Sequence, residues 1–531
     1  MVSCLRGLSN VQLAVIQKSK EFYGTTINAM LLPAERTNRQ LMSVFMFCAA
    51  LLVVIANWSG LGWSWDSTDY ISAGRAISHG LGPLDVTAQP MTVRTPGYPA
   101  LIAIGEWLNL PINYTLVIIN AICASLIIGC TYLILYRNAR RSATIFATAF
   151  VLLSPTLLWQ YTMAWSEPPF IAVLMLTMIV SLYMQHRSKY ALLAVLFSAL
   201  FFLRYVGPVF AAPIAMIGIF VDCKNRGWLR AITGNASALI VSFIPMYWWL
   251  MRNHRIDGTY TGARSPGGGT FLQSLLNAYG TIGTFFSGQP FDAVLYDTWT
   301  SYPIAARASI VFISIVLIAA FIYLTTWINR GGNFKNHSPV APMLAFVVTS
   351  YLIFSAYRFV HMEQGRLDTR MMVPVFIPIV IVATILLDRI TTNQRALSIA
   401  VFAFMAPFFL VNSGITTRDA LRFSTESRHS STTENKNLPL YQFVRQLPDT
   451  KGFFSNAPQQ LAPFVNAWPI FNQFQMDTPR PVACTHRFAI WYKGFVLQDN
   501  IPDTAPIIYE DSIATVYDLG LCSIDINKIW D

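Results

Sequence analysis

Residues 41–70 read LMSVFMFCAALLVVIANWSGLGWSWDSTDY, a long apolar run followed by acidic residues. Its first part, residues 41–58, is apolar and uncharged, and it is long enough to cross the hydrocarbon core of a bilayer as a helix. Asp66, Asp69 and Tyr70 follow shortly after this run. The stretch therefore predicts a membrane span whose far end is followed by acidic side chains.

Apolar runs of this kind recur along the whole chain. Of its 531 residues 54% are hydrophobic and only 12% are charged, whereas soluble domains carry about 25% charged residues. We predict spans at residues 41–58, 114–135, 143–164, 168–185, 190–203, 207–221, 231–251, 308–328, 339–357, 371–387 and 396–413. The fold class is therefore an all-α polytopic membrane bundle of about eleven transmembrane helices.

Two segments need separate treatment. The apolar run 190–221 is interrupted only by Arg204, so either two short helices or one long bent helix fits it. Segment 98–109, YPALIAIGEWLN, is too short to span a bilayer. We predict that it forms a helix at the membrane interface.

The orientation follows from the positions of Lys and Arg. Short loops on the cytoplasmic side of membrane proteins are enriched in these residues. Five short loops together hold 12 Lys and Arg against two acids, namely 136–142, 186–189, 222–230, 329–338 and 388–395. This pattern places the N-terminal segment 1–40 in the cytoplasm. Segment 1–40 lacks the apolar core of a cleavable signal peptide, so the first span is expected to serve as signal and anchor.

The opposite, non-cytoplasmic face then carries the longer connections. These are the outer loops 59–113 and 252–307 and the C-terminal segment 414–531. Short alternating runs in segment 414–531 predict a small α/β domain, with a hairpin near 506–518 that turns at Glu510–Asp511. Cys484 and Cys522 both lie in this domain, where a disulfide and two buried thiols are equally compatible with the sequence.

Ionisable residues from separate helix ends are expected to meet on this outer face. If residues 66–70 are helical, Asp66 shares a face with Asp69 and Tyr70. Spacing alone favours solvated acids at an ordinary helix cap, but a carboxylate at the mouth of a bundle can also accept a proton from an acceptor. Glu167, Arg204, Arg252 and Arg370 come from other helix ends at the same depth.

Each of these charges taken alone reads most simply as a residue at the membrane boundary. Arg204, however, interrupts an apolar run, where a charge costs about 2.5–3.5 kcal/mol unless it is paired or reaches water. Because acids and arginines from five helix ends converge, we predict a polar cavity for an anionic ligand. Arginine suits phosphate, since its planar fork binds two oxygens at once.

Several function classes are excluded or disfavoured. The sequence has no G-x-x-x-x-G-K-[ST] motif for a P-loop, and no HExxH or paired CxxC for a standard zinc site. The net charge of +11 does not indicate nucleic-acid binding, because Lys and Arg punctuate the apolar runs instead of forming a patch.

The residues above resemble the GT-C superfamily of lipid-phosphate-sugar glycosyltransferases, which includes protein O-mannosyltransferases and lipid A aminoarabinose transferases. The resemblance covers about residues 41–413. The matching positions are Asp66-Ser67-Thr68-Asp69-Tyr70, Arg94-Thr95-Pro96-Gly97-Tyr98-Pro99, Ser166-Glu167-Pro168, Arg204, Arg252-Asn253, and Arg370 with Pro374. Many members have Asp-Glu where this chain has Asp66-Ser67, which leaves Asp69 as the substitute for the second acid.

The resemblance implies an inverting transfer of a sugar from a polyprenyl phosphate to a glycan, lipid or protein acceptor. It implies that Asp66 is the base, with Asp69 and Glu167 as auxiliary acids. Arg204, Arg370 and Arg252 are expected to bind the donor phosphate, and Tyr70, Arg94 and Asn253 to belong to the substrate loops. A metal-independent reaction and a divalent metal at the acids are both compatible with the sequence. The expected location is the plasma membrane, such as a bacterial inner membrane, with a periplasmic or extracellular C-terminal domain.

The main rival is a transporter or flippase of lipid-linked sugars. A transporter is expected to show internal repeats and to carry its charges near the midplane of the bilayer. The sequence shows no such repeat, and the charges stand at helix ends on one side. A non-catalytic membrane scaffold would not require the acid-Tyr pattern followed by RTPGYP at 94–99. The transferase is therefore the favoured reading.

Overall fold

The structure is a computed structural model of the chain. It describes residues 35–426 except 187, 263–269, most of 288–339, 362–368 and 392–393. In the C-terminal part it describes residues 435, 437–447, 453–464, 470–471, 488–493 and 506–518.

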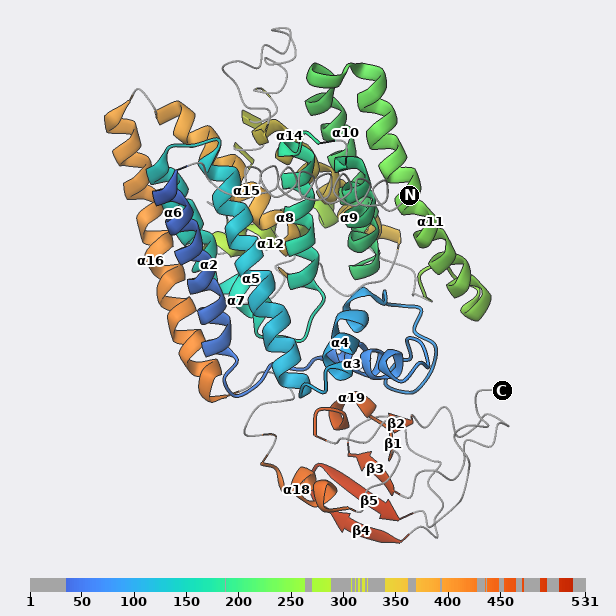
Figure 1. Ribbon diagram of the computed structural model, residues 1–531. Helices are drawn as coiled ribbons and strands as arrows, with labels where there is room; N and C mark the ends of the chain where they lie inside the picture. The colour runs from blue at the N-terminus through green and yellow to red at the C-terminus, as the bar shows by residue number, and fades with distance from the viewer. Residues whose placement is uncertain are drawn as a thin grey trace, which may run out of the picture.

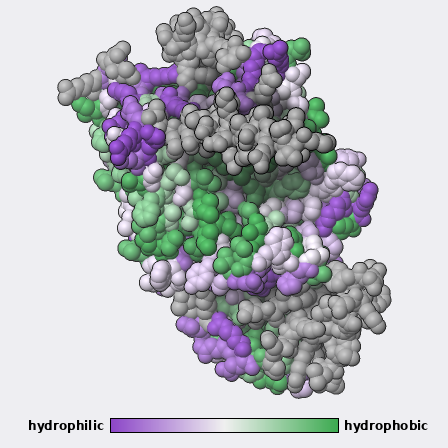
Figure 2. Space-filling model, in the orientation of Figure 1, coloured by the Kyte–Doolittle hydropathy of each residue, from purple (hydrophilic) through white to green (hydrophobic). Residues whose placement is uncertain are grey.

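A bundle of helices forms the larger part of the molecule (Figure 1). Its helices are α2 (Arg36–Ala56), α5 (Ile112–Tyr136), α6 (Arg141–Leu152), α7 (Pro155–Tyr161), α8 (Glu167–Tyr183), α9 (Lys189–Leu203), α10 (Gly207–Arg226), α11 (Trp228–Asp257), α12 (Phe271–Ser287), α14 (Val340–His361), α15 (Thr369–Thr391) and α16 (Arg395–Thr425). Helix α15 lies in the interior of the bundle, and 83% of its most apolar stretch is buried. In α16 only 6% of the corresponding stretch is buried. Apolar side chains on α16 are therefore left to face lipid. Figure 2 shows a hydrophobic belt across the middle of the visible face, with hydrophilic residues at either end.

Six of the described helices are long and apolar enough to cross a membrane, namely α2, α5, α11, α14, α15 and α16. Helices α6 and α7 meet at a bend of 50° and together give a seventh candidate span. Helices α8, α9 and α10 are apolar but shorter. The run 190–221 forms two helices, α9 and α10, which separate at Arg204. The predicted span 308–328 lies largely outside the described residues.

Part of the segment predicted as the outer loop 252–307 is helical. Helix α11 continues to Asp257, and residues 271–287 form α12, which packs against α14 and α15. Ala278, Ile282 and Phe285 are buried in the core of the bundle. Ser, Thr, Asn and Gly dilute the hydrophobicity of this segment, so its sequence does not stand out as an apolar run.

Two short helices lie across one end of the bundle. They are α3 (Trp65–Ser78) and α4 (Gly97–Trp107), and α4 is the helix predicted at 98–109. The two helices pack closely at Gly74. An added Cβ atom there would lie 2.6 Å from the side chain of Ile102 and 3.1 Å from the carbonyl oxygen of Pro99. Figure 1 shows both helices on the same end of the bundle as the C-terminal domain.

The C-terminal domain is a small α/β unit. It consists of α18 (Pro439–Gln446), β1 (Phe453–Ser455), α19 (Pro458–Leu461), β2 (Ile470–Phe471), β3 (Phe488–Tyr492), β4 (Ile507–Glu510) and β5 (Ala514–Asp518). The strand order is β2-β1-β3-β5-β4. Strand β1 is parallel to β2 and β3, while β5 is antiparallel to β3 and β4.

The predicted hairpin at 506–518 is confirmed, since β4 and β5 pair antiparallel. Its turn spans residues 511–513, slightly later than the predicted Glu510–Asp511, and the Asp511 carboxylate accepts hydrogen bonds from the amides of Ile513 and Ala514. Helix α16 continues past residue 414, the predicted start of the C-terminal segment, to Thr425. Cys484 and Cys522 lie outside the described residues.

Candidate active site

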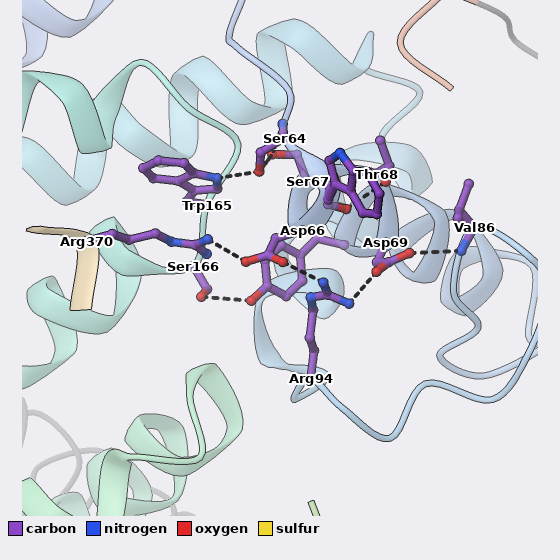
Figure 3. Close-up of polar contacts among 12 residues, drawn as sticks. Ser64, Asp66, Ser67, Thr68, Asp69, Val86, Arg94, Trp165, Ser166 and Arg370 are labelled. Atoms are coloured by element: carbon purple, nitrogen blue, oxygen red, sulfur yellow. Dashed lines mark hydrogen bonds and ion pairs between the residues drawn. The ribbon is translucent and has the colours of Figure 1, made fainter. Parts of the chain in front are cut away.

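Helix α3 holds two carboxylates on one face. The helix begins after Ser64, whose backbone amide donates to Ser67 Oγ at 3.0 Å in a capping box. Asp66 stands in the first turn, where the helix dipole favours an anion. Figure 3 shows Asp66 and Asp69 pointing toward the same guanidinium, that of Arg94. The face predicted from the spacing of these residues is therefore present.

Arg94 bridges the two carboxylates. Its Nη2 lies 2.5 Å from Asp66 Oδ1, and its Nη1 pairs with Asp69 Oδ2. The backbone near Arg94 is tied to the bundle, because Tyr205 Oη donates to the Thr92 carbonyl at 2.6 Å. The loop before α4 thus presents Arg94 in a fixed position.

Arg370 and Glu167 continue the chain of charges into the bundle. Glu167 is the first residue of α8, and it is fully buried. The prolines after it suit the first turn of a helix, where a backbone N–H is not needed, and so fix where α8 begins. Arg370 Nη1 lies 2.5 Å from Asp66 Oδ2, and its Nε and Nη2 donate to Glu167. The Arg370 guanidinium also stacks over the ring of Trp165, 4.4 Å from its centroid.

Arg204 reaches Glu167 from the break between α9 and α10. Arg204 has extended backbone angles that end α9, and its guanidinium pairs with the Glu167 carboxylate. The turn that follows needs glycine at position 207, because a Cβ atom there would lie 2.4 Å from the backbone carbon of Leu200. The break in the apolar run therefore delivers a cation to a buried acid.

These contacts form one ionic chain beside a cavity. The chain runs from Asp69 through Arg94, Asp66, Arg370 and Glu167 to Arg204. The cavity measures about 300 Å³. The residues that line it are Asp66, Tyr70, Val93, Arg94, Thr95, Leu203, Arg204, Tyr205, Val206, Tyr351, Arg358, Arg370 and Met371. Four arginines, Arg94, Arg204, Arg358 and Arg370, thus line the same cavity as Asp66, and guanidinium groups are suited to bind an anionic ligand.

The two acids on α3 differ in their pKa. Burial alone would raise the pKa of Asp66, but Arg370 and Arg94 outweigh that effect and hold the pKa well below its usual range. Burial raises the pKa of Asp69 to about 6, since Arg94 offsets it only in part and the nearby charges of Asp85 and Asp66 add to it. Asp66 is therefore anionic at neutral pH, whereas Asp69 changes its charge at a pH only slightly below neutral.

The other predicted residues fall into two groups. Tyr70 lines the cavity, and its hydroxyl lies 3.2 Å from Ser166 Oγ. Arg252 and Asn253 do not line it. Arg252 Nη1 donates to the Met91 carbonyl at 2.9 Å, and Asn253 Nδ2 donates to Tyr205 Oη at 2.8 Å. These two residues brace the loop that carries Arg94.

Sequence reasoning missed Arg358 and Trp165. Arg358 lines the cavity from the last turn of α14, directly after the predicted span 339–357. An arginine at a helix end was the signal used for Arg204 and Arg252, and it applied here too. Trp165 Nε1 donates to Ser64 Oγ at 2.7 Å while Arg370 stacks on its ring. Nothing in the sequence distinguishes this tryptophan from the others.

The carboxylates of this site are engaged by arginine. Within the described parts of the chain, no three His, Cys, Asp or Glu side chains are grouped as a metal ion would require. Asp66 uses both of its oxygens on guanidinium groups. The arrangement is suited to hold an anion next to a carboxylate.

Known structures share this architecture. The crystal structure of ArnT from Cupriavidus metallidurans bound to undecaprenyl phosphate superimposes with a TM-score of 0.57 at 12% identity, covering 90% of this chain and 98% of ArnT. The apo structure of the same ArnT gives 0.55 at 11% identity, covering 90% and 97%. The chain therefore shares the fold of these ArnT structures. The sequence itself matches no model of a known protein family and no curated protein.

Proposed function

We propose that the chain is an integral membrane glycosyltransferase that takes a sugar from a polyprenyl phosphate. The observation that carries this proposal is the arginine-rich cavity of about 300 Å³ at the end of a GT-C bundle, with Asp66 in its wall. The acceptor is a glycan, a lipid or a protein. The bilayer supplies the donor laterally, because its polyprenyl chain stays among the lipids.

The donor phosphate is assigned to the arginines in the cavity wall. Arg204 and Arg370 are the predicted ligands, and Arg358 adds a third guanidinium to the same cavity. Hydrogen bonds between ionised partners are about twice as strong as neutral ones, and a guanidinium can bind two phosphate oxygens. Undecaprenyl phosphate is bound in the ArnT structure, which supports this class of donor. We assign Arg252 a structural role, because it donates to the Met91 carbonyl in the loop that carries Arg94.

The base is assigned to Asp66. A base must first reach the proton that it takes, and only then does its pKa matter. Asp66 lines the cavity, while Asp69 is 8% exposed and is not among the residues that line it. Its paired arginines make Asp66 a weak base in the empty site. A donor phosphate that draws Arg370 toward itself would restore basicity to Asp66 at the moment when it is needed.

The reaction proposed is a direct displacement. The acceptor oxygen forms a bond to the anomeric carbon from the face opposite the phosphate, and its proton passes to Asp66. The bond between the anomeric carbon and the phosphate oxygen breaks, and its electron pair leaves on that oxygen. Arg204, Arg358 and Arg370 stabilise the charge that develops on the leaving phosphate. The configuration at the anomeric carbon inverts.

The site is assigned to the non-cytoplasmic face of the plasma membrane. About eleven crossings are proposed, consisting of the six long helices, the bent pair α6–α7, the three shorter helices α8 to α10, and segment 308–328. With residues 1–40 in the cytoplasm, this count places the end of α16 and the C-terminal domain outside. The basic loop 136–142 then lies inside.

Binding of the donor can be measured on the purified protein. Native mass spectrometry in lipid nanodiscs, with undecaprenyl phosphate as the probe, should show a bound lipid in the wild type. Arg204→Ala and Arg370→Ala should lose it, while Arg230→Ala, at an exposed arginine of α11, serves as the control. Equal binding by all four proteins would overturn the assignment of the phosphate site.

A further inference from the structure

A turn from the first outer loop is built into the core of the C-terminal domain. The side chain of Val86 is 1% exposed and packs in the same apolar cluster as Leu440, Phe453, Leu461, Phe488 and Val516. Helix α19 of that domain also packs against α3, which carries the two acids. The domain therefore contacts the active-site helix at two points, one direct and one through Val86.

The turn that carries Val86 is rigid. The Asp85 carboxylate accepts hydrogen bonds from the backbone amides of Thr87 and Gln89, at 2.8 and 3.0 Å, and from the Thr87 hydroxyl at 2.7 Å. The Asp85 amide donates to the Gln89 carbonyl at 2.8 Å, and Ala88 adopts a left-handed conformation that closes the turn. A displacement of Val86 is therefore passed to the whole turn.

Val86 also touches the ionic chain. Its backbone amide donates to Asp69 Oδ1 at 3.4 Å, while the other oxygen of Asp69 pairs with Arg94. Figure 3 shows this sequence of contacts from Val86 through Asp69 and Arg94 to Asp66. The side chain of Val86 thus packs in the core of the C-terminal domain, while its backbone amide contacts the ionic chain of the site.

We propose that Val86 is a positioning residue through which the docked C-terminal domain fixes Asp69, and through Asp69 the pair Arg94–Asp66. The proposal rests on the function proposed above as far as catalysis is concerned. Its physical basis is that the amide of Val86 is held where the apolar core of the domain holds its side chain. Loosening that anchor leaves Asp69 with one fewer donor and lets Arg94 move toward Asp66.

The test compares two equal truncations in one core. Val86→Ala removes two methyl groups at the anchor. Val516→Ala removes two methyl groups from a side chain of strand β5 that is fully buried in the same cluster. Both variants should lose similar thermal stability. The charged groups that face Asp69 are Asp66 on its own helix, Arg94 from the loop and Asp85 from the turn. Loss of the Val86 amide, which favours the anion, should raise the pH of the acid limb of activity in Val86→Ala and leave it unchanged in Val516→Ala.

Hydrogen–deuterium exchange on the full-length protein separates this inference from the proposed function. Peptides that cover residues 66–72 and 84–90 should exchange several-fold faster in Val86→Ala than in Val516→Ala. That result without any sugar transfer would keep the coupling and overturn the transferase. Sugar transfer with identical exchange and identical pH profiles in the two variants would overturn the coupling and keep the transferase.

Discussion

At the residue scale, the site is a chain of alternating charges in which each carboxylate is paired with at least one arginine. Asp66 is shared by Arg94 and Arg370, and Glu167 is shared by Arg370 and Arg204. A buried charge is tolerated only when it is paired, so each member depends on its neighbours. In the mechanism proposed above, an incoming phosphate competes with these carboxylates for the guanidinium groups. Its binding would thus be coupled through Arg370 to the basicity of Asp66.

The first prediction concerns Asp66. Asp66→Asn keeps the shape of the side chain but removes the proton acceptor, so sugar transfer should fall by about 10²- to 10⁴-fold. Binding of undecaprenyl phosphate should persist, because the arginines remain. Transfer assays on membranes with matched expression levels measure the loss. Transfer at the wild-type rate would remove Asp66 from the role of base.

The second prediction concerns the pH dependence set by Asp69. Its pKa is raised to about 6, so Asp69 is protonated below that pH and charged above it. As the pH falls through 6, Arg94 loses one of its two carboxylate partners, and kcat/KM should fall with it. Asp69→Asn should show a lower kcat/KM without this acid limb. An unchanged limb in Asp69→Asn would assign the titration to another group.

The third prediction concerns Arg358, which the sequence did not single out. Arg358→Ala should weaken donor binding about 10- to 100-fold, because a hydrogen bond to a charged group contributes about 1.5–3 kcal/mol. Arg358→Lys should recover part of the loss, since it keeps the charge but not the planar fork. The KM for the lipid donor measures both effects. Equal KM values for all three proteins would exclude Arg358 from the donor site.

At the element scale, glycine joints bring the short helices against the bundle. A Cβ atom at Gly97, the first residue of α4, would lie 2.4 Å from the carbonyl oxygen of Phe202, two residues before Arg204. Close contact between the two backbones is therefore what sets Arg94 and Arg204 on the same cavity. The RTPGYP stretch requires glycine for this approach.

A matched pair of variants tests this joint. Gly97→Ala should destabilise the protein by about 1–3 kcal/mol through overpacking. Gly414→Ala adds the same methyl group inside helix α16, where it meets nothing within 4 Å. It should be neutral or stabilise by up to about 1 kcal/mol, because alanine favours a helix more than glycine does. Thermal unfolding in detergent compares them, and an equal effect of both changes would contradict the close contact.

The sequence predicts helices well where a long apolar run decides them. The runs at 41–58, 114–135 and 371–387 correspond to α2, α5 and α15, because a bilayer demands length and apolarity of any segment that crosses it. Helix α12 was not predicted, because its polar and small residues interrupt the apolar pattern. The helix is instead stabilised by packing on α14 and α15. That compensation depends on tertiary contacts that a single window of sequence does not contain.

For the site, the sequence predicted the meeting of charges but not their pairing. Asp66, Glu167, Arg204 and Arg370 were expected on one face, and the structure joins them in one ionic chain. Arg252 was expected at the donor phosphate and instead donates to a backbone carbonyl. Helix-end position fixes depth in the membrane, whereas side-chain direction depends on how the helices rotate against one another.

At the scale of the whole molecule, the two ends of the bundle differ in chemistry. Helices α3 and α4 and the C-terminal domain lie at one end (Figure 1), and Asp66 and Tyr70 of α3 line the cavity. The connection between α5 and α6 lies at the other end, and its sequence is basic, with Arg137 and Arg140 followed by Arg141 at the start of α6. The proposed orientation puts the basic end in the cytoplasm and the C-terminal domain outside.

Cysteine labelling tests this orientation. In a protein otherwise free of cysteine, Ser512→Cys in the exposed β4–β5 turn should react with a membrane-impermeant maleimide added to the outside of sealed cells. Ser142→Cys, exposed at the start of α6, should react only after the membrane is opened. The reverse pattern would invert the molecule in the membrane and place the site in the cytoplasm.

Mass spectrometry of lipids and glycans from the native cells tests whether the chain transfers a sugar from a polyprenyl phosphate. Cells with the wild-type protein are compared with cells that lack it and with cells that carry Asp66→Asn. In both altered strains one glycan, glycolipid or glycoprotein should lack a single sugar, and the matching polyprenyl-phosphate sugar should accumulate. Identical glycans and identical lipid-linked sugars in all three strains would contradict the account.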